Sequence, residues 1–233
     1  MNQNTTIILW VVGALIVGGI VGWWIGLAMA VPTQVTNTTS SSNTATNTTA
    51  SGGHSIKAHD FMVTMDKLWE DHITWTRLYI VSAVNKLPDA DATLARLMKN
   101  QEDLGNAIKP YYGENAGNQL TALLKIHISL AGKIVADALS NNTTAVTNDQ
   151  TQWKDNANQI ADFLSQANPT NWPQADVRKM MQDHLTLTTQ EAVDIIGKKS
   201  QASIDDYDKV KDEILTMSQT LSQGIVNQFP DKF

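Results

Sequence analysis

The chain has 233 residues, of which 42% are hydrophobic and 17% are charged, and its formal net charge is −6. This composition suits one well-packed domain, and the negative charge argues against a nucleic-acid-binding protein. No cysteine occurs, so thiolate metal sites, thiol nucleophiles and disulfides are excluded, and any metal would need nitrogen and oxygen ligands.

The first segment, residues 1–30, is predicted to be a membrane anchor. Residues 7–30 read IILWVVGALIVGGIVGWWIGLAMA, contain no charge and are long enough to cross a hydrocarbon core of about 30 Å. Ala28 and Ala30 would also fit the end of a cleaved signal peptide. We favour a retained anchor, because the apolar run is long for a signal peptide and no basic residue precedes it.

One face of this anchor carries three glycines. Gly18, Gly22 and Gly26 are four residues apart, so another helix backbone can approach that face closely. The spacing predicts pairing in the membrane, with a second copy of the chain or with another membrane subunit. The alternative is that they reflect only the ordinary glycine content of membrane helices.

Residues 31–53 form a linker rich in Asn, Thr and Ser. The segment has no apolar periodicity and is predicted to be a flexible tether. Asn37 and Asn47 begin N-x-T glycosylation sequons, and Asn142 begins another in a later loop. The linker therefore predicts a single-pass protein of the cell membrane whose soluble domain, residues 54–233, lies outside the cytoplasm.

The soluble domain is predicted to be all-α. Apolar residues recur at three- and four-residue spacing between short turn sequences that contain Gly, Pro, Asn and Asp, and no run is typical of a strand. Pro88, Pro110, Pro173 and Pro230 lie at the expected helix boundaries. Six helices are expected, at residues 57–87, 91–109, 115–140, 146–167, 174–197 and 201–228.

The odd-numbered helices of this set repeat one pattern. The segments LWEDHITWTRLYIVSA, LLKIHISLAGKIVADA and MMQDHLTLTTQEAVDI align at His72, His127 and His184, with large apolar residues before and after each histidine. The spacings of 55 and 57 residues are those of a helical hairpin. Three such hairpins, stacked or closed around a shared core, would give a helical bundle of about six helices.

The repeated histidine has three interpretations. It packs at the core edge of each hairpin, it titrates as a protonation switch, or the three imidazoles meet and bind a divalent transition metal such as Zn²⁺, Cu²⁺ or Fe²⁺. In the metal hypothesis, Glu191 is a candidate ligand beside His72, His127 and His184, because it shares the helix face of His184. The metal site is the alternative function that the sequence leaves open.

A second candidate site is a polar pocket between the first two hairpins, formed by Asn100, Gln101, Asp103 and Asn106. Gly105 lies within the same helix, where glycine costs about 1 kcal/mol relative to alanine, so it suggests close approach by a helix or a ligand. The alternative is a hydrogen-bonded core network without a ligand.

Residues 66–233 resemble a family of small prokaryotic all-helical proteins, through the stretches LWEDHITWTRL, NQEDLGNAIKPYYG and the terminal FPDKF. The resemblance implies a helical domain and no particular chemistry. No G-x-S-x-G, H-E-x-x-H, P-loop or G-x-G-x-x-G motif occurs, and this absence argues against an enzyme. The sequence therefore favours a membrane-tethered binding or interaction module, as an accessory subunit or a surface component.

Overall fold

The computed structural model describes residues 55–233, which form a bundle of helices. The predicted anchor with Gly18, Gly22 and Gly26, and the linker with Asn37 and Asn47, lie outside these residues. None of the described helices combines the length and the apolarity that a membrane span requires.

The all-α prediction is confirmed, since residues 55–233 contain no strand. The ends of the helices agree with the predicted ends to within a few residues, except at the kink inside α3. The elements in chain order are α2 (Ile56–Asn85), α3 (Ala90–Leu139), α4 (Thr143–Ala167), α5 (Gln174–Ile196), α6 (Ser200–Gln228) and the 3-10 helix η2 (Pro230–Lys232).

The helix boundary predicted at Pro110 is wrong by three residues, because Pro110 lies inside α3 and the break occurs at Gly113. Gly113 has φ 86° and ψ 169°, a conformation that only glycine adopts without strain. The break divides α3 into two helical segments and leaves carbonyl groups of the first segment without partners along the helix. The ammonium group of Lys232 donates to the carbonyl of Pro110, which supplies one of the missing hydrogen bonds.

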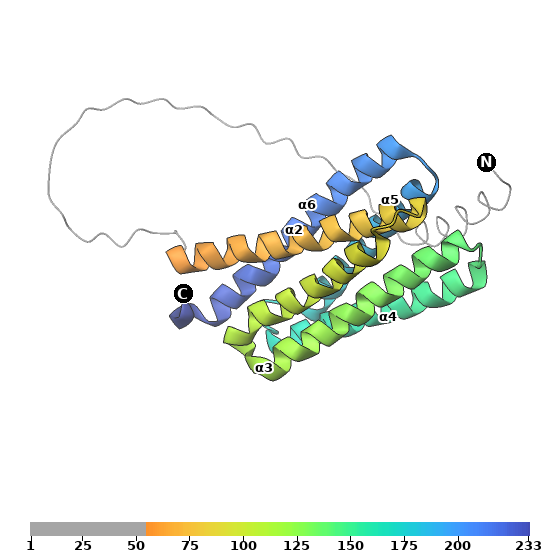
Figure 1. Cartoon of the computed structure of the whole chain (residues 1–233). Helices are drawn as coiled ribbons and strands as arrows, with labels where there is room; N and C mark the ends of the chain where they lie inside the picture. The colour runs from red at the N-terminus through yellow and green to blue at the C-terminus, as the bar shows by residue number, and fades with distance from the viewer. Residues whose placement is uncertain (1–54) are drawn as a thin grey trace, which may run out of the picture.

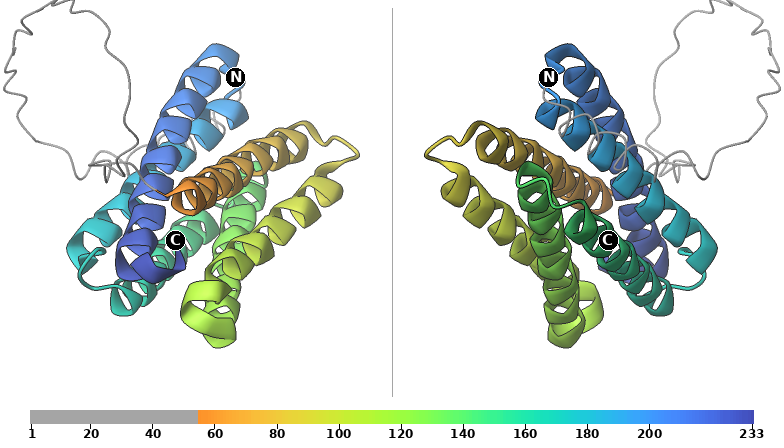
Figure 2. Two further views of the ribbon diagram at one scale, coloured as in Figure 1. Left: turned by 90° about the vertical axis from the view of Figure 1, so that its left-hand side faces the viewer. Right: turned by 90° about the vertical axis from the view of Figure 1, so that its right-hand side faces the viewer.

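The bundle closes on itself because α2 lies against both α3 and α6 (Figures 1 and 2). The remaining neighbours along the chain, α3 with α4, α4 with α5 and α5 with α6, also pack together. Ser55 Oγ donates to the carbonyl of Phe233 at 3.0 Å, so the first and last described residues meet. An open solenoid of hairpins is therefore excluded for this domain, and equivalent faces of the helices turn toward one interior.

One end of the bundle is closed by aromatic rings. Phe61 lies 5.0 Å from Tyr111 and 5.2 Å from Phe233, and Tyr111 stacks on Phe233 at 5.1 Å between ring centroids. Tyr112 makes an edge contact with Phe229 at 5.2 Å. The KPYYG and FPDKF stretches, far apart in sequence, thus pack together and join the kink in α3 to the C-terminus.

Candidate functional site

The three repeated histidines meet in the interior. The ring centroid of His184 lies 5.8 Å from that of His72 and 6.3 Å from that of His127. All three side chains are buried, with residue exposures of 3%, 3% and 4% for His72, His127 and His184. Each comes from a different helix, α2, α3 or α5, so the closed bundle brings the repeat positions into one layer. We call these three residues the histidine layer.

Each histidine contacts a polar side chain on the next helical segment, 29 residues further along the chain. Nδ1 of His127 lies 3.0 Å from Asn156 Oδ1, and Nδ1 of His184 lies 3.0 Å from Glu213 Oε2. Nδ1 of His72 lies 3.3 Å from Gln101 Nε2. An amide or a carboxylate at the same sequence separation therefore contacts every ring, and these contacts link α2 to α3, α3 to α4 and α5 to α6.

The orientation of Asn156 determines where His127 carries its hydrogen. The Nδ2 group of Asn156 donates to the carbonyl of Leu123 at 3.2 Å, so its Oδ1 faces the imidazole as an acceptor. Nδ1 of His127 must then be the donor, and in the neutral ring Nε2 is left with a free lone pair. Burial, and secondly the nearby His184, lower the pKa of His127 to about 3, so this ring is neutral at physiological pH.

His72 has a more crowded polar environment. Burial lowers its pKa well below the usual value, and the neighbouring imidazoles of His184 and His127 lower it further. Nε2 of Gln101 also lies 2.8 Å from the carbonyl of Leu97 and 3.1 Å from Asn100 Oδ1. These three acceptors compete for two amide hydrogens, so the interaction with His72 is the weakest of the histidine contacts.

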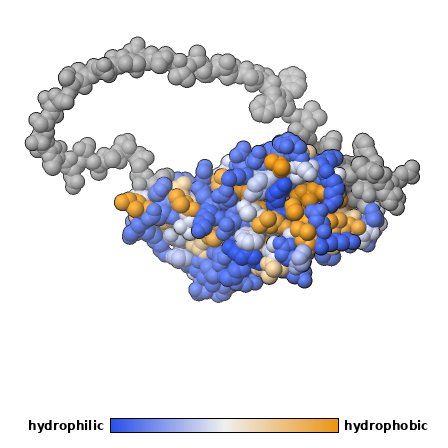
Figure 3. All heavy atoms as spheres, turned by 45° about the horizontal axis from the view of Figure 1, so that its top comes forward, coloured by the Kyte–Doolittle hydropathy of each residue, from blue (hydrophilic) through white to orange (hydrophobic). Residues whose placement is uncertain are grey.

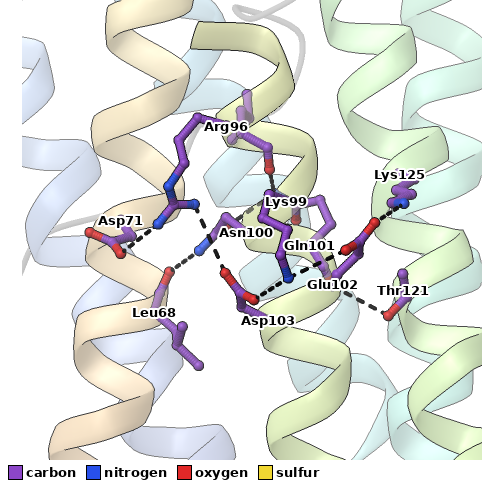
Figure 4. Close-up of polar contacts among 11 residues, drawn as sticks. Leu68, Asp71, Arg96, Lys99, Asn100, Gln101, Glu102, Asp103, Thr121 and Lys125 are labelled. Carbon is purple, nitrogen blue, oxygen red and sulfur yellow. Dashed lines mark hydrogen bonds and ion pairs between the residues drawn. The ribbon is translucent and has the colours of Figure 1, made fainter. Parts of the chain in front are cut away.

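Asn100 and Gln101 are fully buried beside the histidine layer, whereas the other two residues of the predicted pocket lie elsewhere. Asn100 Nδ2 donates to the carbonyl of Leu68 at 2.9 Å, and Asp103 joins a surface network with Lys99 (Figure 4). Asn106 is exposed. The structure therefore divides the four residues, and the buried pair belongs to a core network that links α2 to α3.

Gly105 marks a close approach between the two segments of α3, as its position suggested. The carbonyl oxygen of Gly117 would lie 2.5 Å from a Cβ atom at residue 105, and the side chain of Thr121 would also clash. The close approach is therefore to a helix, which was one of the two possibilities that glycine at this position left open.

Glu191, the carboxylate predicted as a metal ligand beside the three histidines, forms an ion pair with an arginine of α2. Its carboxylate pairs with Arg77 Nη1 at 2.5 Å, and the same nitrogen donates to the carbonyl of Ser203 at 2.9 Å. Burial raises the pKa of Glu191, and Arg77 partly opposes that shift. Within residues 55–233, no group of three or more His, Asp or Glu side chains has the arrangement of a metal site.

A partly open apolar cavity lies among α2, α3, α4 and α5, on the side of the histidine layer away from the aromatic end. Its volume is about 50 Å³, and it opens toward solvent. The wall includes Thr76, Ala131 and Thr188, each four residues after a layer histidine and so one helical turn beyond it. Figure 3 shows hydrophobic residues gathered on one face of the bundle among hydrophilic surroundings.

Sequence reasoning missed this cavity and the role of Trp153 in its wall. Trp153 lines the cavity, and its ring centroid lies 5.1 Å from that of His127. A signal was present, because the position four residues after each histidine is small or hydroxylated: Thr76, Ala131 and Thr188. Small side chains at equivalent positions of a closed bundle leave space between the helices.

The remaining candidate, Asn142, lies at the turn between α3 and α4. Its side chain accepts a hydrogen bond from the backbone N–H of Ala145 at 3.1 Å and caps α4. The residue is exposed, so it is accessible for the predicted modification. Glycosylation at Asn142 stays a prediction.

Comparisons with known proteins give no relative from which a role can be transferred. No family model, no curated protein and no solved structure matches the chain.

Proposed function

We propose that the protein is a membrane-tethered binding module whose helical domain lies outside the cytoplasm and holds a ligand in the apolar cavity. The observation that carries this proposal is the cavity itself, an apolar space lined by residues of α2, α3, α4 and α5. Small-molecule sites are typically concave and mostly apolar, with few polar groups. The uncharged residues 7–30 and the Asn/Thr-rich linker support the membrane attachment and the external location.

The domain would be built from three repeats of one helical hairpin. The support is the common spacing of 29 residues between each histidine and its polar partner. In such a bundle the histidine layer would form the centre. The helices would close around aromatic rings on one side of this layer and leave the ligand cavity on the other side.

Ligand retention provides the first test. The full chain is purified from its membrane, and the small molecules bound to it are extracted and identified by mass spectrometry. The matched variant is Ala131→Phe, which places a large ring in the cavity wall. A molecule retained at close to one per chain and lost from Ala131→Phe would support the proposal. Identical extracts from the two proteins would contradict it.

The location has its own test, protease treatment of intact cells that express the full chain. Cleavage within the linker or domain is expected while a cytoplasmic marker protein stays intact. Protection of the domain until the membrane is opened would place it inside the cell. Deletion of residues 1–30 should release a folded helical protein, whereas an aggregated product would indicate that the anchor belongs to an obligate assembly.

A metal site at the histidine layer is the second candidate function. The observation that favours it is the bonding of Nδ1 in His127 and His184 to Asn156 and Glu213, because histidine ligands usually anchor one nitrogen in this way and bind metal through the other. The rings would have to move closer, since the arrangement in residues 55–233 is not that of a metal site.

Metal analysis of the purified full chain distinguishes this candidate. About one zinc, copper or iron per chain, lost in His127→Asn and retained in the exposed control His59→Asn, would support it. Substoichiometric metal that is the same in wild type and His127→Asn would reject it.

A further inference from the structure

Two buried polar groups in the cavity wall have no hydrogen-bond partner among residues 55–233. They are the indole nitrogen of Trp153 and the hydroxyl of Thr188. Both residues line the cavity and are 5% and 6% exposed. Buried polar groups are nearly always hydrogen-bonded, and leaving one without a partner costs about 1–3 kcal/mol. Two such groups beside one apolar space call for a physical explanation.

The other threonines of the same wall show that Thr188 is exceptional. Thr76 Oγ1 donates to the carbonyl of His72 at 2.8 Å, and Thr189 Oγ1 donates to the carbonyl of Leu185 at 2.6 Å. This bond to the carbonyl four residues earlier is the ordinary way for a helical threonine to satisfy its hydroxyl. Thr188 makes no such bond within the described residues, so its buried hydroxyl has an unmet capacity to donate a hydrogen bond.

The charge of the wall restricts the chemical class of that molecule. None of the lining residues carries a charged side chain. An unpaired carboxylate, phosphate or ammonium group buried there would lose its hydration without compensation, at a cost of many kcal/mol. The indole N–H of Trp153 can only donate a hydrogen bond, and the hydroxyl of Thr188 can donate one as well. The part of the molecule that is buried beside these donors must therefore be uncharged and must carry a hydrogen-bond acceptor.

We propose that the cavity binds an uncharged lipophilic molecule with a carbonyl or hydroxyl oxygen, and that this oxygen accepts hydrogen bonds from Trp153 and Thr188. The inference rests on the proposed function and specifies the ligand of the same cavity. The cavity volume of about 50 Å³ holds only a few heavy atoms, so only the end of the molecule that carries the oxygen would lie beside these two donors. Such a molecule partitions into membranes, which agrees with a domain tethered beside one.

Three ten-carbon probes separate the requirements for the ligand: 2-decanone is neutral with a carbonyl, decane has no oxygen, and decanoate is an anion. The full chain in detergent micelles is labelled with ¹⁵N, and its tryptophan indole N–H resonances are followed by NMR during titration. The Trp153 resonance is assigned as the one that disappears in Trp153→Phe. We expect 2-decanone to move this resonance at the lowest concentration, decane to bind about three- to tenfold more weakly, and decanoate not to bind.

Conservative variants test the two donors. Thr188→Val removes the hydroxyl with little change of shape, and it should weaken 2-decanone binding about three- to tenfold while decane binding stays unchanged. Trp153→Phe should also weaken 2-decanone binding and leave decane binding unchanged. Because this variant lacks the Trp153 resonance, its titration is followed through the indole resonances of the other tryptophans. The matched control is Trp69→Phe, because the indole nitrogen of Trp69 is also buried without a described partner but lines a different cavity. Binding in this control should match the wild type.

The outcomes separate this inference from the proposed function. Equal binding of decane and 2-decanone, unaffected by Thr188→Val and Trp153→Phe, would overturn the ligand class and leave binding in the cavity standing. Preference for decanoate would also overturn the ligand class. The absence of any shift with all three probes would overturn both proposals.

Discussion

The two ends of the bundle, on either side of the histidine layer, differ in how they use apolar residues. At one end Phe61, Tyr111 and Phe233 pack around the kink in α3 and the C-terminus, over the largest apolar cluster. At the other end the apolar residues form two small clusters, one including Ile80 and Val135, beside the open cavity. On the proposed function, the closed end supplies stability and the open end holds the ligand, with the histidine layer between them.

The largest expected effect comes from close packing on the closed side. Gly105→Ala introduces a Cβ atom 2.5 Å from the carbonyl oxygen of Gly117, and backbone cannot yield as a side chain can. We expect the free energy of unfolding to fall by about 3 kcal/mol, measured by urea denaturation. The matched control at the open end is Gly132→Ala, whose nearest contact is the movable hydroxyl end of Tyr79 at 3.2 Å. The control should lie within about 1 kcal/mol of wild type, and equal losses in both variants would contradict the comparison.

The histidine layer, which lies between the two ends, is expected to make the free energy of unfolding depend on pH. The pKa of His127 falls from 6.5 to about 3 on folding, mainly through burial, so between these values the unfolded chain binds a proton that the folded chain does not. Stability attributable to this ring is therefore complete above the unfolded pKa and is lost as the pH falls toward 3. Between about pH 7 and about pH 4.5 the loss from His127 is about 2.5 kcal/mol.

Urea denaturation of wild type and His127→Asn at both pH values measures this loss. The dependence on pH should be smaller in His127→Asn by about 2.5 kcal/mol, whereas the exposed control His59→Asn should keep the full dependence. An unchanged dependence in His127→Asn would show that the ring is not held neutral by burial.

A moderate effect is expected from the aromatic rings themselves. Phe233→Ala removes the contacts with Phe61 and Tyr111 and should lower the free energy of unfolding by about 2 kcal/mol in urea denaturation, because the ring is only half-buried. Leu139→Ala, at an exposed position at the opposite end, is the control and should cost less than about 0.5 kcal/mol. The reverse order of the two losses would mean that the closed end is not the stabilising one.

The smallest predicted effect has the opposite sign. Thr188→Val replaces a buried hydroxyl without a described partner by a methyl group of the same shape, so it should stabilise the unliganded protein by about 1 kcal/mol. Thermal denaturation followed by circular dichroism would show a raised Tm. A lowered Tm would indicate that the hydroxyl of Thr188 already has a hydrogen-bond partner. That result would remove the main argument for a ligand at the open end.

The helices and the histidine repeat were predictable because both depend on local periodicity. Apolar spacing and turn residues located the helices, whereas the break at Gly113 instead of Pro110 depended on a positive φ that a helix pattern does not reveal. The convergence of the histidines required closure of α2 onto α6, which sequence spacing left open. The pairing of Glu191 with Arg77 also depends on that closure, since it joins residues 114 positions apart.

Hydrogen–deuterium exchange of the full chain, with and without 2-decanone, tests the difference between the two ends most directly. The account predicts slower exchange in residues 76–80, 128–135 and 188–196, which contribute to the cavity wall, and unchanged exchange around Tyr111 and Phe229 at the aromatic end. Protection spread equally over both ends, or confined to the aromatic end, would contradict the assignment of the open end as the binding site.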